Sequence, residues 1–195
     1  MEQFGADVRD WLNAFWRVLL LPRSQTYVEL GEVADGKWKG LVAWLVGVAV
    51  CSFALANALV PGGMLPSTLF ILIMFYPIGV LMWIMLIHLG YQKLFGRKKD
   101  KHAELLYVLG SIVVVTAMGN LVIGQIPVIG NALSYLELLY GAVVVVLATR
   151  AITRLDLWRV IAAVTLATLG TVVLVALLAL FLAGLTSTNS QLFRP

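Results

Sequence analysis

The chain has 195 residues, of which 61% are hydrophobic and only 12% are charged, with a formal net charge of +4 and a mean hydropathy of +0.95. Because a soluble domain carries about a quarter charged residues, this composition excludes an ordinary water-soluble fold and predicts an integral membrane protein. The single cysteine, Cys51, excludes an intramolecular disulfide, and the length suits one membrane domain with no separate soluble domain.

Residues 1–38 are predicted to form an amphipathic arm ahead of the membrane domain. Apolar side chains recur in it at helical spacing, with polar side chains opposite. These apolar residues are Val8, Trp11, Leu12, Phe15, Trp16 and Leu19. The pattern is typical of a helix lying in the headgroup plane, with Trp11, Phe15 and Trp16 as its interfacial anchors. A compatible alternative is that the same stripe packs against the ends of the membrane spans.

A second, shorter helix is predicted in the remainder of the arm. Pro22 ends the first helix, and Ser24 is placed to cap the next one. Tyr27, Leu30 and Ala34 would then share one apolar face.

The membrane domain is predicted to cover residues 39–186 and to be followed by a short polar tail at 187–195. Charged residues and turn signals divide it into five spans, at about 41–60, 68–89, 105–123, 132–149 and 160–185. The stretch from 105 to 149 is too long for one span, since about 20 helical residues cross the ~30 Å hydrocarbon core. Its Gly- and Pro-containing midpoint, 124–131, predicts a tight turn.

The alternative to helices is buried strands, because 112–115 and 143–146 are rich in β-branched residues. In lipid, a strand leaves backbone groups unpaired unless the sheet closes into a barrel, and barrel strands alternate polar and apolar residues. No such alternation is present. The predicted fold class is therefore all-α, a polytopic transmembrane helical bundle with an interfacial amphipathic helix at its amino terminus.

The loop charges predict the orientation. Thirteen of the fourteen Lys and Arg residues lie in the arm with the adjoining Lys39, the 93–101 loop and the 150–159 loop, and only Arg194 lies elsewhere. By the positive-inside rule the amino terminus is cytoplasmic and the carboxy terminus is outside. The amino terminus also lacks the features of a cleavable signal peptide.

The loop between the second and third spans concentrates positive charge. Its basic residues are Lys93, Arg97, Lys98, Lys99 and Lys101. Beside a span, such a cluster is expected to meet anionic lipid headgroups on the cytoplasmic side, with ~1 kcal/mol from each base. The alternative is that the loop is only a topology signal. A nucleic-acid partner is not predicted.

Glu137 is the one acidic residue inside a predicted span. In the first interpretation it lies shallowly, or is protonated, and bonds a neighbouring helix. In the second it forms an intramembrane polar site for a proton or substrate, together with Asn120, Gln125 and Asn57. Against a transporter, the sequence contains one membrane carboxylate and no evident repeat.

Motifs for other chemistry are missing from the sequence. His88, His102 and Cys51 lie on different predicted elements and share no ligand spacing, so no metal site is predicted. No phosphate-binding glycine loop, nucleophile elbow or H-E-x-x-H motif is found. We therefore predict no cofactor, no catalytic residue and no enzymatic activity.

Small residues recur every four positions in two spans. They are Ala43, Gly47 and Cys51 in the first span, and Ala163 and Ala167 in the last. Such ridges let helix backbones approach closely. They predict packing within the chain or, as the alternative, a homo-oligomer interface.

The chain also resembles the Yip1-domain family, especially its bacterial members. Pro22 and Tyr27 are similar to the proline and aromatic residue of that family's arm. The 126–130 turn with 135–141, and the basic 150–159 loop, resemble its later hairpin and last cytoplasmic loop. The likeness covers about residues 19–185. It implies a multi-pass protein of the bacterial inner membrane. The eukaryotic members' D-L-Y-G-P motif is missing, so their GTPase role is not carried over.

Three functions fit these observations. The first is a non-enzymatic membrane protein that organises lipid or partner proteins, which the arm and the small-residue ridges favour. The second is a small transporter or channel that uses the polar residues around Glu137. The third, an enzyme acting on lipid, needs a cluster of polar groups that the sequence does not provide.

Overall fold

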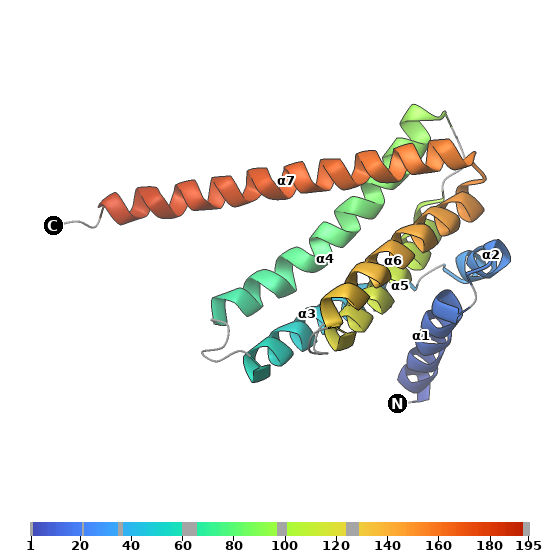
Figure 1. The fold of residues 1–195 in the computed structure, drawn as a ribbon, viewed down its shortest axis with the longest axis horizontal. Coiled ribbons are helices and arrows are strands. Elements are labelled where there is room, and N and C mark those ends of the chain that lie inside the picture. The colour runs from blue at the N-terminus through green and yellow to red at the C-terminus, as the bar shows by residue number, and fades with distance from the viewer. Residues whose placement is uncertain are drawn as a thin grey trace.

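The computed structural model describes residues 2–20, 22–34, 37–59, 66–96, 101–123 and 129–192. Over these ranges the ordered elements are all helical (Figure 1). The α-helices are α1 (Glu2–Leu20), α2 (Ser24–Glu32), α3 (Trp38–Leu59), α4 (Pro66–Leu89), α5 (His102–Ile123), α6 (Gly130–Thr153) and α7 (Leu157–Leu192), and the π-helical turn η1 (Gly90–Leu94) continues α4. The prediction of an all-α fold is confirmed.

Four of the described helices are long and apolar enough to cross a membrane. The stretches that meet this criterion are Ile73–Leu94, His102–Asn120, Ala132–Thr153 and Leu157–Leu178. They overlap the last four predicted spans, with bounds that differ by several residues, and a multi-pass helical membrane protein is thereby supported. The first predicted span, 41–60, falls on α3, whose described apolar stretch Gly40–Leu55 is shorter.

Two element boundaries differ from the sequence prediction. Helix α7 continues to Leu192, into the residues predicted as a polar tail, and its 36 residues extend over ~54 Å at 1.5 Å per residue. Ser24 was predicted as a cap, which is wrong, because Arg23 occupies the N-cap position and no side chain there bonds the helix start.

The helices form an uneven bundle (Figure 1). Helices α5 and α6 are joined as an antiparallel hairpin and pack extensively on each other. Helices α3 and α4 pack together beside them, and α7 packs along α4 and then extends away from the other helices (Figure 1). Helix α1 packs on α5, and α2 packs on α5 and α6, both on the side away from α7 (Figure 1).

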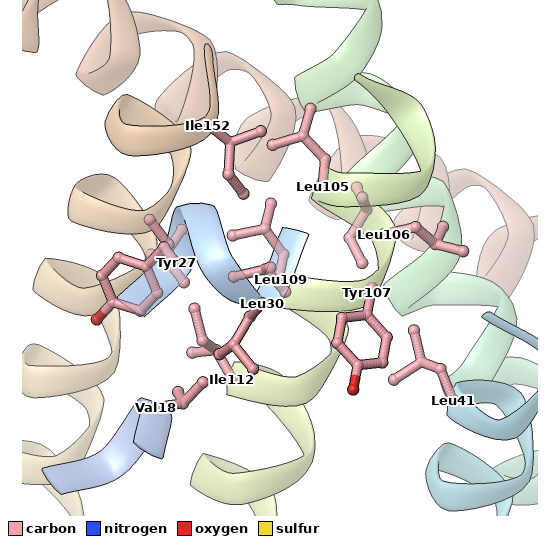
Figure 2. Close-up of a cluster of buried hydrophobic side chains, with 14 of the residues drawn as sticks. Val18, Tyr27, Leu30, Leu41, Leu105, Leu106, Tyr107, Leu109, Ile112 and Ile152 are labelled. Atoms are coloured by element: carbon pink, nitrogen blue, oxygen red, sulfur yellow. The ribbon is translucent and has the colours of Figure 1, made fainter. Parts of the chain in front are cut away.

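The arm contributes directly to the buried core. Tyr27 and Leu30 of α2 belong to the same buried cluster as Leu109 of α5 and Val18 of α1, with the Tyr27 ring on the side of α6 (Figure 2). Tyr27 is fully buried, and Leu30 is 4% exposed. The predicted face of α2 is thus confirmed, and that face is used for packing on the bundle.

Close helix contacts depend on glycine at two positions. At Gly110 of α5, an added Cβ would collide with the buried side chain of Leu41 on α3. At Gly40 of α3, an added Cβ would lie 2.9 Å from Nε1 of Trp11. Small residues at such crossings let helix backbones approach closely. In lipid, where no hydrophobic force acts between helices, this close van der Waals packing is a main source of stability.

Two ion pairs lie within the arm, the second of them formed by Lys37 just before α3. Arg17 of α1 pairs with Glu29 of α2, and Lys37 Nζ lies 3.0 Å from Asp10 Oδ2. All four side chains are substantially exposed, so each pair contributes little to the free energy of unfolding. The arm is therefore held mainly by its buried apolar face.

Candidate functional site: an intramembrane cavity at Glu137

Glu137 lies two turns into α6, about 10 Å along the helix axis from Gly130. Its carboxyl group lies against α5 at Gly119, where an added Cβ would collide with Oε1. The absence of a side chain at Gly119 leaves the space that the carboxyl group occupies. Glycine at this position of α5 therefore determines where the Glu137 carboxyl group can lie.

A cavity of about 390 Å³ lies beside this carboxyl group, between α4, α5, α6 and α7. Its described wall comprises Tyr76 and Trp83 of α4, Ile112, Val113, Thr116, Ala117 and Asn120 of α5, Glu137, Leu138, Gly141, Ala142 and Val145 of α6, and Val164 and Thr168 of α7. Most of these side chains are apolar. The volume falls in the range of about 300–1,000 Å³ that is typical of small-molecule sites.

The two threonine hydroxyls in the wall already have partners. Thr116 Oγ1 lies 3.0 Å from the carbonyl oxygen of Ile112, to which it can donate. Thr168 Oγ1 donates to a carbonyl of its own helix at 2.9 Å and accepts a hydrogen bond from Trp83 Nε1 at 3.1 Å. The last bond joins α4 to α7 across the cavity wall. With these two hydroxyls satisfied, Glu137 and Asn120, together with the Tyr76 hydroxyl, are the main polar groups left for a ligand.

The structure brings together two of the four residues predicted for the polar site. Glu137 and Asn120 line the same cavity. Asn57 is on α3, outside the described wall, and its amide donates to the carbonyl of Phe53 at 3.0 Å. Gln125 lies outside the described residues. A functional role for these residues stays a prediction.

Sequence reasoning missed the aromatic part of the wall. Tyr76 and Trp83 are seven residues apart on α4, which puts them on one face of the helix two turns apart. Thr116 and Asn120, and likewise Glu137 and Gly141, are four residues apart on their helices. This spacing was visible in the sequence, but nothing in the sequence showed that the faces converge.

The three predicted interfacial anchors have different surroundings. Trp11 is 4% and Phe15 is 7% exposed, whereas Trp16 is 63% exposed. The Trp11 ring lies 4.9 Å from that of Tyr107, and the Phe15 ring lies 5.2 Å from that of Trp44. Trp11 and Phe15 thus pack against other helices of the chain, as the alternative interpretation of the stripe predicted. Anchoring in the lipid headgroups stays a prediction, for which Trp16 is the available side chain.

The predicted headgroup loop is described only at its two ends. Lys93 is exposed at the end of η1, and Lys101 forms an ion pair with Glu104. Arg97, Lys98 and Lys99 lie outside the described residues. Binding of anionic headgroups at this loop stays a prediction.

The fold brings together two histidines that the sequence placed on separate elements. The ring centroids of His88 and His102 are 5.2 Å apart, and His88 also contacts Tyr91. Over the described ranges, no group of three or more His, Cys, Asp or Glu side chains is arranged to hold a metal ion.

The two small-residue ridges differ in their contacts. Ala163 and Ala167 are buried, and an added Cβ at Gly90 would lie 3.7 Å from the Cβ of Ala163. This ridge packs within the chain. On α3, Ala43 and Cys51 are exposed, and an added Cβ at Gly47 would meet no described atom within 4 Å. Whether a second copy covers the α3 ridge stays an open alternative.

Comparison with known proteins found no relative of this chain. No family model, no curated protein and no solved structure matches the chain.

Proposed function

We propose that this chain is a non-enzymatic multi-pass protein of a bacterial inner membrane, related to the Yip1-domain family, that organises lipid by holding an amphipathic molecule in the cavity at Glu137. Five spans are proposed, with α3 as the first. The amino terminus is then cytoplasmic and the carboxy terminus is outside, which the loop charges support.

One observation carries the lipid-binding proposal: the cavity between α4, α5, α6 and α7 has a mostly apolar wall and a polar part formed by Glu137 and Asn120. This combination matches a molecule with a hydrocarbon body and a polar group. Apolar pockets with a few convergent polar groups are the usual form of small-molecule sites. The wall offers no paired carboxylates, metal cluster or nucleophile–base pair among its described residues, so binding rather than catalysis is proposed.

Filling the cavity tests this proposal. Ala142 is an exposed lining residue of α6, so Ala142→Phe adds bulk to the cavity wall without entering the buried core. Ala132→Phe is the matched control, since Ala132 is exposed on the same helix and is not among the described lining residues. Native mass spectrometry of the purified protein should show one tightly retained amphipathic molecule lost in Ala142→Phe and kept in the control. Equal retention in both variants would refute the proposal.

A second candidate is a proton-coupled transporter, favoured by the position of Glu137. Its Oε2 atom is buried and has no hydrogen-bond partner among the described residues. In vesicles that contain the protein and a pH-sensitive dye, a transporter should dissipate an imposed pH gradient, and Glu137→Gln should abolish that flux. Wild-type vesicles that retain the gradient as long as empty ones would exclude proton leak through this site.

A further inference from the structure

The Glu137 carboxyl group has no counter-charge in the described wall. No Lys, Arg or His is found among the described lining residues. Oε2 is buried and lacks a hydrogen-bond partner in the part of the chain that the structure describes. A buried polar atom without a partner is unfavourable, and a buried unpaired charge is more so. The group therefore needs a proton or a ligand that supplies a positive charge.

The rest of the wall is unsuited to an inorganic cation. Such ions take about six or more oxygen ligands in proteins, or retain several waters. Here Glu137 is the one carboxylate among the described lining side chains, and the Thr168 hydroxyl oxygen already accepts a hydrogen bond from Trp83. Besides Glu137, the oxygen atoms of the described lining side chains are the Asn120 amide oxygen and the single hydroxyls of Tyr76, Thr116 and Thr168, which are spread over α4, α5 and α7.

The same wall suits an organic cation. Tyr76 and Trp83 present aromatic rings, whose faces attract ammonium groups by cation–π interaction. Ile112, Val113 and Val145 supply apolar surface for a hydrocarbon body. An ion pair with Glu137 in surroundings of low dielectric constant is stronger than the same pair in water.

From these contacts we infer that the cavity binds an amphipathic organic cation, with its ammonium group paired to Glu137 and its apolar body between α4, α5, α6 and α7. This inference rests on the proposed ligand-binding role of the cavity and names the ligand class. The ammonium group has two possible sources, a free hydrophobic amine or a lipid with a choline-type headgroup.

Titration calorimetry with benzyltrimethylammonium tests the inference on the full chain in an uncharged detergent. We expect saturable binding to the wild type. The affinity of Glu137→Gln should be at least about tenfold lower than that of the wild type, as for the loss of one charge-assisted contact. Glu137→Asp keeps the charge and should bind more tightly than the Gln variant. The matched control is Glu32→Gln, which removes an exposed carboxylate of α2 and should bind like the wild type.

The outcomes that overturn the inference are clear. The first is that the wild type melts cooperatively but shows no saturable binding. The second is that the wild type and Glu137→Gln bind with equal affinity. Either result leaves the cavity-filling test with Ala142→Phe to decide on the proposed function separately, because that test does not depend on charge.

The lipid source is distinguished by repeating the titration in nanodiscs. If a choline headgroup occupies the site, benzyltrimethylammonium should bind more weakly in phosphatidylcholine than in phosphatidylglycerol nanodiscs. Equal affinity in both would assign the site to free hydrophobic cations.

Discussion

The crossing of α5 over α3 gives a prediction whose magnitude follows from the contacts. A Cβ at Gly110 would lie 2.9 Å from Leu41 Cγ and closer to its methyl groups, where ordinary contacts are 3.4–4 Å. Leu41 is fully buried, so its side chain has no free space into which to move. Overpacking of this kind costs about 1–3 kcal/mol. Gly110→Ala should therefore destabilise the bundle, although Ala favours a helix by about 1 kcal/mol over Gly.

Gly47→Ala is the control that isolates the clash. It makes the same exchange within a helix, and the added Cβ would meet no described atom within 4 Å. Because the gain in helix propensity is common to both variants, the difference between them should be about 1–3 kcal/mol in favour of Gly47→Ala. On the scale of soluble domains of this size, each kcal/mol shifts the melting temperature by about 2–4 °C. Tryptophan fluorescence of the protein in detergent measures that temperature.

A second substitution tests the assigned cause. Leu41→Ala removes the side chain that the added methyl group would meet, so the double variant with Gly110→Ala should recover part of the loss. The expected coupling is about 0.5–3 kcal/mol. If Gly110→Ala melts no lower than Gly47→Ala, or if the double variant shows no coupling, the close approach of α5 to α3 is wrong.

Three further predictions concern the arm and the topology. Trp11→Ala should release the arm, since truncating a buried Trp costs about 3–5 kcal/mol, and limited trypsin should then cleave the arm faster than in the exposed-site control Trp16→Ala. Burial raises the pKa of Tyr27 from 10.0 to about 12, so the tyrosine stabilises the fold below pH 10 and this contribution is lost as pH rises toward 12. Tyr27→Phe should remove that alkaline loss from the melting curves, and an unchanged pH profile would contradict it. Reporter fusions after Asp156 should be cytoplasmic and those after Pro195 external; a cytoplasmic Pro195 fusion contradicts five spans.

The helices could be predicted from the sequence because lipid imposes strong constraints on it. A charged residue is costly in hydrocarbon, so the basic clusters at 93–101 and 150–159 mark where helices end. Within a span every backbone group must be bonded, which leaves the helix as the available structure. These constraints act residue by residue, and they can be read without knowing which helices are neighbours.

The surface against which the arm packs could not be predicted in the same way. The stripe containing Trp11 and Phe15 is apolar, and both a headgroup layer and a groove between helices accept an apolar stripe. The deciding contacts are with Tyr107 and Trp44, which lie far along the chain. Spacing within one helix contains no information on such partners. The same reason explains why the meeting of His88 and His102 was missed.

The position of the Glu137 carboxyl group gives a last prediction, which separates geometry from charge. Gly119→Ala would place a Cβ where Oε1 now lies, and the flexible end of the Glu137 side chain can move aside. The cost to stability should therefore be small, about 1 kcal/mol or less, since no buried backbone has to shift. The carboxyl group would nevertheless leave its place beside the cavity, so benzyltrimethylammonium should bind several-fold more weakly while the charge is retained. Titration calorimetry and a melting curve on the same sample measure the two effects, with Gly47→Ala as the control. Unchanged affinity in a well-folded Gly119→Ala protein would mean that the carboxyl group does not act from this position.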